Sequence, residues 1–247
     1  MEEIQKHIRC KYGDIGKYVL TPGDQGRAKR ISERLDNVRE VSANRGYFVY
    51  TGRLDTVPVS VCSTGIGGPS TSIAIEELAK VGGKYFIRVG SAGGRQKNIP
   101  IGSIVVATSA FRGEGTSQAY IPLGFPAVAS LKVTNALIEA TKHLGYDSYI
   151  GTVFTRDAYY VQDKFLNQLL TKYGIVASEQ ECSISFILGS IYKLHVGSVL
   201  VTDSNIWLEK QPTLAEKETL FKIGEKKAVD VAIEAVKILI AKEKERY

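Results

Sequence analysis

VPVSVCSTGIGGPSTSIAIEELAKVGGKYFIRVGSAGG, residues 57–94, places two short apolar runs on either side of a longer amphipathic segment. The runs Val57–Cys62 and Tyr85–Val89 are rich in β-branched and aromatic residues, which favours strands. Apolar residues recur at helical spacing in Ser70–Lys80, so this segment is predicted to be a helix. A strand, a helix and a second strand in this order are typical of an α/β fold around a central sheet.

The same alternation extends through the rest of the chain, without a linker or an internal repeat. We therefore expect a single domain covering residues 1–247. Further strands are predicted at Tyr18–Thr21, Tyr47–Gly52, Ser103–Thr108, Ile150–Phe154 and Val196–Thr202. Further helices are predicted at Ala28–Leu35, Leu131–Leu144, Lys164–Lys172, Cys182–Tyr192 and Leu214–Glu245. The many charges of the last helix are assigned to a solvated face.

The composition of the 247 residues is that of a soluble globular protein, with 44% hydrophobic and 23% charged residues. The formal charge of +6 is spread along the chain among acidic residues and is not interleaved with aromatic residues. We therefore expect no nucleic-acid partner, and a few well-placed arginines fit a small anionic substrate better.

The cysteines and the N-terminal segment bear on the cellular compartment. Cys10, Cys62 and Cys182 are far apart and lack metal-ligand spacing, so neither a disulfide framework nor a zinc site is predicted. The segment MEEIQKHIRCKYGD is too charged for a signal peptide, and no apolar run is long enough to span a bilayer. We expect a cytoplasmic protein with no membrane partner.

Three arginines lie beside strand-forming apolar residues, where a charged side chain needs a partner. Arg88 precedes the glycine-rich end of YFIRVGSAGG, Arg27 follows the turn PGDQG, and Arg45 lies in ANRGYFVY. Each alone is as consistent with a structural ion pair as with a ligand site. Together with Ser91 and glycine amides that can approach an anion closely, they predict a site for a tetrahedral oxyanion such as phosphate.

Two other phosphate-binding patterns are excluded. GDQG lacks the spacing of the dinucleotide fingerprint, and the chain contains no GKS or GKT sequence of a Walker motif. In an open α/β sheet, ligands bind beyond the carboxyl ends of the strands. Polar residues follow several predicted strands, in LTPGDQGR, CSTGIGGPS, RVGSAGG and VTDSNIW, so the predicted site lies at one edge of the sheet.

Seven motifs resemble, in order and spacing, those of the nucleoside phosphorylase family, which includes hexameric purine nucleoside phosphorylases and uridine phosphorylases. The motifs are GDQGR, NRGYFVYTG, CSTGIGGPSTSIAIEELAKVG, RVGSAGG, RDAYY, EQE and VTDSN. The resemblance covers nearly the whole chain and implies one α/β domain with a central mixed sheet flanked by helices, assembled as a hexamer from three dimers. It also implies reversible phosphorolysis of a nucleoside, with inorganic phosphate as co-substrate and with neither a cofactor nor a metal.

The resemblance divides the phosphate site between two subunits. Arg45 matches an arginine that reaches in from the neighbouring subunit of a dimer. His7 matches a histidine, also lent by the neighbour, that hydrogen-bonds the ribose 5'-hydroxyl. Without the resemblance, a lone N-terminal histidine is interpreted as a solvated side chain. The phosphate-binding residues implied within one subunit are Gly23, Arg27, Arg88 and Ser91.

The ribose site implied by the resemblance centres on the segment EQE. Glu181 matches a glutamate that accepts hydrogen bonds from the 2'- and 3'-hydroxyls, and Glu179 matches the first acid of the family's Glu-Met-Glu motif. Taken alone, two acids separated by one residue also suit the start of a helix. Gln180 replaces the usual methionine, which offers an apolar and adaptable surface to the sugar, so the contact of Gln180 with the sugar differs from the family pattern.

The base site implied by the resemblance draws on two segments. Tyr159 and Tyr160 match aromatic residues that stack on the base and ribose, and Gln162 loosely matches a glutamine of uridine phosphorylases. Asp203 matches an aspartate of the purine enzymes that protonates N7 of the departing base, which a raised pKa makes possible. Lys217 stands where those enzymes carry an arginine that assists this proton transfer. The alternatives are core packing for the tyrosines and a helix cap for the aspartate.

Different parts of the sequence favour different bases. Asp203, Ser91 and the short segment between Tyr160 and Glu179 favour a purine ribonucleoside such as inosine or guanosine, which is the expected substrate. Similarities in CSTGIGGPSTSIAIEELAKVG and PLGFPAVASLKVTNALIEA favour the alternative, a uridine phosphorylase. Two further alternatives remain, namely a nucleosidase that uses water in place of phosphate and a non-catalytic nucleoside-binding protein.

Overall fold

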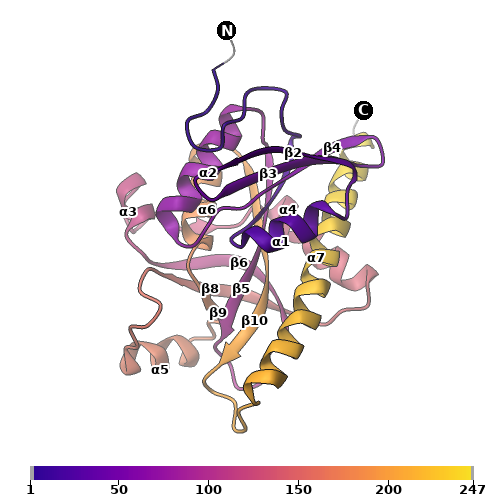
Figure 1. Ribbon diagram of the computed structural model, residues 1–247. Coiled ribbons are helices and arrows are strands. Elements are labelled where there is room, and N and C mark those ends of the chain that lie inside the picture. Colours follow the sequence, from indigo (N-terminus) through magenta and orange to yellow (C-terminus); the bar gives the residue numbers. More distant parts are fainter. Residues whose placement is uncertain (1–2, 246–247) are drawn as a thin grey trace.

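The computed structural model describes residues 3–245 as one ten-stranded mixed sheet flanked by helices (Figure 1). The strands are β1 Tyr18–Pro22, β2 Asp36–Asn44, β3 Tyr47–Leu54, β4 Val57–Cys62, β5 Tyr85–Gly94, β6 Ile104–Gly113, β7 Ala127–Val128, β8 Ser148–Arg156, β9 Ala177–Glu179 and β10 His195–Asn205. The helices are α1 Gln25–Ser32, α2 Gly68–Lys80, α3 Thr116–Tyr120, α4 Leu131–His143, α5 Lys164–Lys172, α6 Cys182–Ile191 and α7 Leu214–Lys244. The fold class predicted from the sequence is confirmed.

Each central strand supplies side chains to two hydrophobic cores, one on each face of the sheet. Tyr18 and Leu20 of β1 lie in one core, while Val19 between them lies in the other. In β5, Ile87 lies in the same core as Tyr18 and Leu20, and Phe86 lies in the same core as Val19. Because side chains alternate between the faces of a strand, a strand buried on both sides is an almost continuous apolar run.

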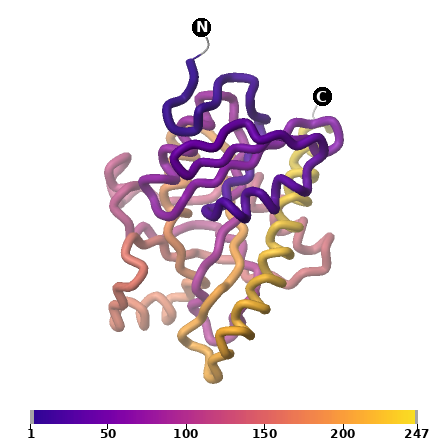
Figure 2. Tube along the Cα trace, in the orientation of Figure 1, coloured from indigo at the N-terminus to yellow at the C-terminus, as the bar shows by residue number. Residues whose placement is uncertain are grey.

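The helices form two layers over these faces. Helices α1, α4 and α7 cover one face and helices α2 and α6 cover the other (Figure 1). α4 packs against α7, and α2 packs against α6. Figure 2 shows that the N-terminal segment and the end of α7 lie at the same end of the molecule, away from α5. None of the helices in residues 3–245 has the length and apolar character needed to cross a membrane.

Strand β5 lies in the middle of the strand order and pairs with three other strands. It runs parallel to β1 and to β10, and its last two residues pair antiparallel with β9. β10 pairs with β6, β6 with β8, and β8 with β9, so these strands and β5 close a ring. The carboxyl ends of β1, β5 and β10 point the same way and bring the polar residues that follow them together.

The structure differs from the sequence-based prediction in a few elements. Strands β2, β7 and β9 and helix α3 were not predicted, and β5, β6 and β10 extend further than expected. Helix α1 begins at Gln25, three residues before the predicted start at Ala28, because the Asp24 side chain accepts a hydrogen bond from the Arg27 backbone N–H at 2.6 Å. This N-cap satisfies a free donor of the first helical turn.

Candidate active site

The turn after β1 allows two backbone segments to approach closely. The Thr64 N–H donates to the Pro22 carbonyl at 2.8 Å, and the Gly65 N–H donates to the Gly23 carbonyl at 3.1 Å. A Cβ at position 23 would lie 2.9 Å from the Gly65 carbonyl oxygen and 4.0 Å from Nη1 of Arg88. Only glycine therefore fits here, beside an arginine side chain.

Arg27 is buried at the start of α1, close to the middle of β5. Its Nε donates to Oε1 of Glu225 at 2.5 Å, and its Nη1 donates to the Val89 carbonyl at 3.2 Å. The guanidinium also lies over the Phe221 ring, 5.8 Å from its centre. Glu225 belongs to α7 and is buried, so one acid of the charge-rich helix is an exception to the predicted solvated face.

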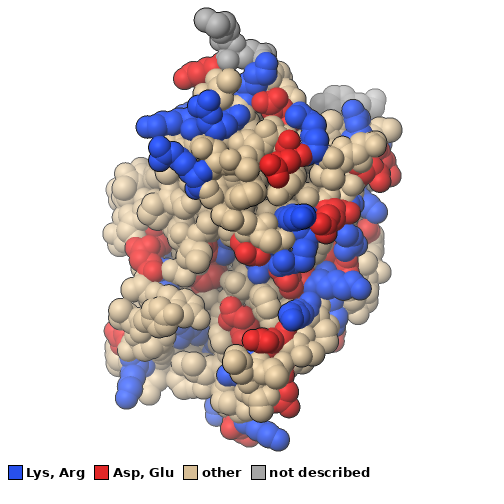
Figure 3. Space-filling view, viewed as in Figure 1, with Lys and Arg blue, Asp and Glu red and all other residues tan. Residues whose placement is uncertain are grey.

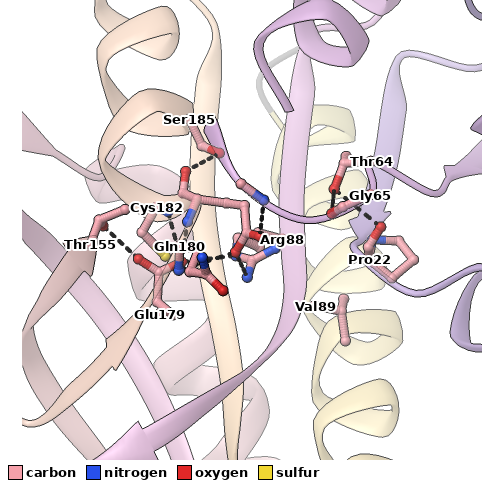
Figure 4. Close-up of polar contacts among 12 residues, drawn as sticks. Pro22, Thr64, Gly65, Arg88, Val89, Thr155, Glu179, Gln180, Cys182 and Ser185 are labelled. Atoms are coloured by element: carbon pink, nitrogen blue, oxygen red, sulfur yellow. Dashed lines mark hydrogen bonds and ion pairs between the residues drawn. The ribbon is translucent and has the colours of Figure 1, made fainter. Parts of the chain in front are cut away.

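Arg88 lies between the turn after β1 and residues 179–181, which are predicted to bind ribose and are called the ribose segment below (Figure 4). Its Nη2 donates to Oε2 of Glu181, and its Nε lies 3.3 Å from Oε2 of Glu179. Nη1 is buried and has no hydrogen-bond partner among the described residues. A buried cationic N–H without a partner is costly, so this donor is poised for an acceptor that a ligand would supply.

Glu181 is held by the glycine-rich start of α2 as well as by Arg88. The Gly67 N–H donates to its Oε1 at 2.7 Å, and Gly67 adopts a φ of 87°, which other residues rarely adopt. Burial raises the pKa of Glu181, the Arg88 guanidinium opposes this rise, and the neighbouring Glu179 carboxylate adds to it. The carboxylate is thus fixed beside a cation, in an arrangement suited to accepting hydrogen bonds from hydroxyl groups.

Glu179 and Gln180 have their polar groups engaged by the protein. Glu179 accepts from the Thr155 hydroxyl at 2.5 Å and from the backbone N–H groups of Glu181 and Cys182 at 2.7 and 2.8 Å. It organises the start of α6, which agrees with the helix-start alternative. Nε2 of Gln180 donates to the Asp157 carbonyl at 2.7 Å and thereby links the ribose segment to the loop after β8.

Asp203 lies near the carboxyl end of β10. Burial raises its pKa above the usual value, although hydrogen bonds from the Ser204 hydroxyl and from its own backbone, together with the charge of Arg27, oppose the rise. The Ser204 hydroxyl donates to Oδ1 at 2.7 Å. Lys217 is half-buried in the first turn of α7, and its side chain forms no hydrogen bond or ion pair within residues 3–245.

The loop after β8 carries the aromatic residues assigned to the base. Tyr159 is 55% exposed and Tyr160 is 91% exposed, so packing in the core, the alternative for both, is wrong. Their rings meet edge to face with centres 5.0 Å apart, and the Arg156 guanidinium lies 5.8 Å from the Tyr159 ring centre. Gln162 accepts a hydrogen bond from Nδ2 of Asn167 at 3.1 Å.

Three further residues were predicted to bind phosphate or ribose, namely Ser91, Arg45 and His7. Ser91 is half-buried in β5, three residues beyond Arg88. Arg45 is exposed at the tip of the β2–β3 hairpin, in a tight turn with Gly46 in which both residues have positive φ. Nδ1 of His7 lies 2.6 Å from Oε1 of Glu77 in the same chain, and its ring is 25% exposed.

The structure adds residues that the sequence-based reasoning missed. Glu225 pairs with Arg27, Gly67 binds Glu181, and Thr155 binds Glu179. The buried Arg95 and the half-buried Arg156 also lie beside the loop after β8. The sequence contained one signal for Arg95, which follows the glycine-rich end of YFIRVGSAGG just as Arg88 precedes it.

Neither the charge distribution nor the acidic side chains suggest another type of site. On the face shown in Figure 3, basic and acidic side chains are intermixed and no stripe of a single sign crosses it. Within residues 3–245, no group of three or more His, Cys, Asp or Glu side chains is placed to hold a metal ion.

Comparisons with known proteins agree on one family. The phosphorylase superfamily matches residues 17–237. A uridine phosphorylase of Thermococcus kodakarensis is 43% identical, over 99% of this chain and 91% of that protein. A guanosine phosphorylase of Halorubrum lacusprofundi is 33% identical, over 82% of this chain and 84% of that protein. The crystal structure of uridine phosphorylase from Vibrio fischeri superposes with a TM-score of 0.87, at 35% identity over 94% of this chain and 96% of that one.

Proposed function

This chain belongs to the phosphorylase superfamily and is a nucleoside phosphorylase, and we propose that it converts uridine and phosphate to uracil and ribose 1-phosphate. The observation that carries the proposal is the position of Arg88, which binds the carboxylate of Glu181 and leaves a buried N–H donor near Gly23. One guanidinium thus borders both the proposed sugar site and the proposed phosphate site. Several relatives are uridine phosphorylases, which favours uridine over the purine nucleoside expected from the sequence.

The proposed reaction follows from this arrangement. Phosphate, bound by Gly23, Arg27, Arg88 and Ser91, attacks C1' of the ribose. The bond from C1' to the base nitrogen breaks as the bond from C1' to a phosphate oxygen forms, and the electron pair of the broken bond leaves with the base. Glu181 accepts hydrogen bonds from the ribose hydroxyls, and the base takes up a proton on release. Inorganic phosphate is the co-substrate, and no step requires another cofactor.

A 6-oxopurine nucleoside is the second candidate substrate. Asp203 supports it, because the raised pKa of a buried carboxyl group allows it to donate a proton to N7 of a purine as the bond to the sugar breaks. The relative from Halorubrum lacusprofundi, which is a guanosine phosphorylase, supports it as well. Tyr159 and Tyr160, both exposed beside the site, would stack on either base.

The proposal includes a dimer in which each subunit completes the site of the other, within a hexamer. Arg45 supports this because it is exposed at a hairpin tip and forms no ion pair with the described residues. His7 supports it because Glu77 holds one ring nitrogen, which orients the other for a ribose hydroxyl of the neighbouring site. Within residues 3–245, neither side chain forms a hydrogen bond or ion pair with Arg88.

The experiment that tests the proposed function is a substrate panel. Uridine, cytidine, inosine, guanosine and adenosine are each incubated with and without phosphate, and the free base and ribose 1-phosphate are measured. We expect uridine to give the highest kcat/KM and turnover to require phosphate. Clearly better turnover of inosine or guanosine would replace uridine with the second candidate. Formation of free ribose without phosphate would establish a nucleosidase instead.

A further inference from the structure

Arg95 is a buried cation that the proposed reaction does not use. It follows β5 directly, one residue beyond Gly94, which pairs with Asn205 near Asp203. Its side chain is 4% exposed, and within residues 3–245 no carboxylate forms an ion pair with it or with the nearby Arg156. Burial and the charge of Arg156 lower the pKa of Arg95 to about 10. A buried charge of this kind persists where neutral groups satisfy its donors.

Two neutral side chains hold this guanidinium. Nε of Arg95 donates to the Ser178 hydroxyl at 2.5 Å, and Nη1 donates to Oδ1 of Asn167 at 2.5 Å. Ser178 directly precedes Glu179 and the ribose segment. The amide of Asn167, which is also buried, then donates from Nδ2 to Oε1 of Gln162 at 3.1 Å. Arg95, Asn167 and Gln162 therefore form a chain that runs from the end of β5 to the loop after β8.

The direction of every hydrogen bond in this chain is determined by its first member. An arginine can only donate, so Asn167 must present its oxygen to Arg95 and its NH2 group to Gln162. Gln162 must in turn present its oxygen to Asn167. Among the described residues, its own NH2 group has one long contact, of 3.5 Å to the Tyr159 carbonyl. The orientation of an amide is normally ambiguous, but here the network fixes it.

We propose that Arg95 and Asn167 are positioning residues that fix the Gln162 amide with its NH2 group toward the base, so that the enzyme selects bases with a carbonyl oxygen over bases with an amino group at that point. The inference rests on the proposed function and deepens it. It applies to uridine against cytidine and equally to inosine against adenosine. A site built to donate a hydrogen bond discriminates strongly, because an amino group leaves its donor without an acceptor.

The same chain also supports the reaction. As the bond from C1' to the base breaks, negative charge develops on the base and is shared by its carbonyl oxygen. The Gln162 N–H donor, polarised through Asn167 by a buried cation, stabilises that charge more than it stabilises the neutral base. The effect of the relay therefore lies in kcat as well as in KM.

The decisive variant is Asn167→Asp, which preserves the shape of the side chain. A carboxylate accepts from Arg95 as Asn167 does, but it cannot donate to Gln162. Gln162 must then turn its NH2 group toward position 167 and its oxygen toward the base. We expect the ratio of kcat/KM for uridine to that for cytidine to fall by about tenfold or more relative to the wild type. A change of this size corresponds to the loss of one hydrogen bond in a network that includes a charged group.

A second variant and a matched control complete the test. Arg95→Met removes the donor that directs the relay without imposing the reverse direction, so its ratio is expected between those of the wild type and Asn167→Asp. Asn135→Asp makes the same change at an exposed position of α4 and is expected to keep the wild-type ratio. Equilibrium binding of uridine and cytidine, measured by calorimetry, gives the same comparison without requiring turnover.

The outcomes separate the relay from the proposed function. A wild type that phosphorolyses uridine while both Asn167→Asp and Arg95→Met keep its base preference overturns the relay alone. A wild type that turns over no nucleoside overturns the proposed function, and the binding ratios still test the relay. Melting temperatures of the variants identify any loss of folding, and in that case Arg95→Lys, which keeps a donor-only cation, must retain the wild-type preference.

Discussion

Asp203 shows how one side chain can separate the two candidate substrates. Burial raises its pKa, so the protonated form persists to a higher pH than in an ordinary aspartate. A purine reaction that uses this proton must lose rate as the pH rises through the raised pKa. A uracil leaving group has no N7, so the uridine reaction needs no such step.

The pH dependence of each reaction tests this role of Asp203. With inosine as substrate, we expect kcat/KM to fall on the alkaline side of the Asp203 pKa and Asp203→Asn to remove that dependence together with about 10²-fold or more of the rate. With uridine, the profiles of wild type and variant are expected to coincide in shape. A limb shared by both substrates and retained in Asp203→Asn would assign the titration to another group.

Strand β5 is the element that the site depends on most, and Gly90 is its tightest position. A Cβ at Gly90 would lie 2.8 Å from Nη2 of Arg88 and 2.8 Å from Cδ2 of Leu200. The glycine therefore makes room for the guanidinium against β10. Gly90→Ala is expected to displace Arg88 from Glu181, to lower kcat/KM for phosphate and nucleoside alike, and to destabilise the fold by about 1–3 kcal/mol.

The control for this substitution is Gly124→Ala, where no neighbouring atom lies within 4 Å of the added Cβ. Chemical denaturation and steady-state kinetics measure both effects. If Gly90→Ala had the stability and the activity of Gly124→Ala, then β10 would have moved to accommodate the added methyl group. Gly90 would then not be needed to hold Arg88 in place.

At the same scale, the sequence predicted the elements with a hydrophobic signal and missed those without one. All seven predicted strands exist, and α5 has the predicted bounds Lys164–Lys172. β2 was missed because none of its residues is buried and six of the nine are exposed, and β9 because it has only three residues. The resemblance gave Arg88 and Glu181 as site residues, and the structure joins them directly. Glu225, which pairs with Arg27, and Asn167, which accepts from Arg95, are distant from those arginines in sequence, and only the fold brings such residues together.

At the scale of the whole molecule, hydrogen bonds join the end of α7 to the first residues of β1 and β5. Glu243 accepts from the Tyr18 hydroxyl at 2.5 Å, from the Tyr85 hydroxyl at 2.7 Å and from Lys17. Burial alone would raise its pKa, but these bonds outweigh it and lower the pKa from 4.5 to about 2. A carboxyl group with a lowered folded-state pKa stabilises the fold above its unfolded pKa, and the contribution is lost as the pH falls.

Thermal unfolding as a function of pH tests this contact. At pH 7, Glu243→Gln is expected to melt at a lower temperature than the wild type. The difference should shrink between pH 4.5 and about 2, because the wild-type carboxylate becomes protonated over this range. Glu234→Gln, at a carboxylate that lies 3.4 Å from Nδ1 of His143, serves as the control on the same helix. An equal difference in melting temperature at pH 7 and pH 2 would contradict the assigned pKa.

The closed ring of strands around β5 also sets the earliest point of translation at which the native sheet can form. β5 is complete once residue 94 has been made, but its partner β10 ends only at Asn205. Until then the edge of β5 is open, and the nascent chain carries Arg88 without the carboxylates that face it in the native structure. Domains form as units during synthesis, and unpaired strand edges invite aggregation. Translation must therefore cover more than four-fifths of this chain before any substrate site can assemble.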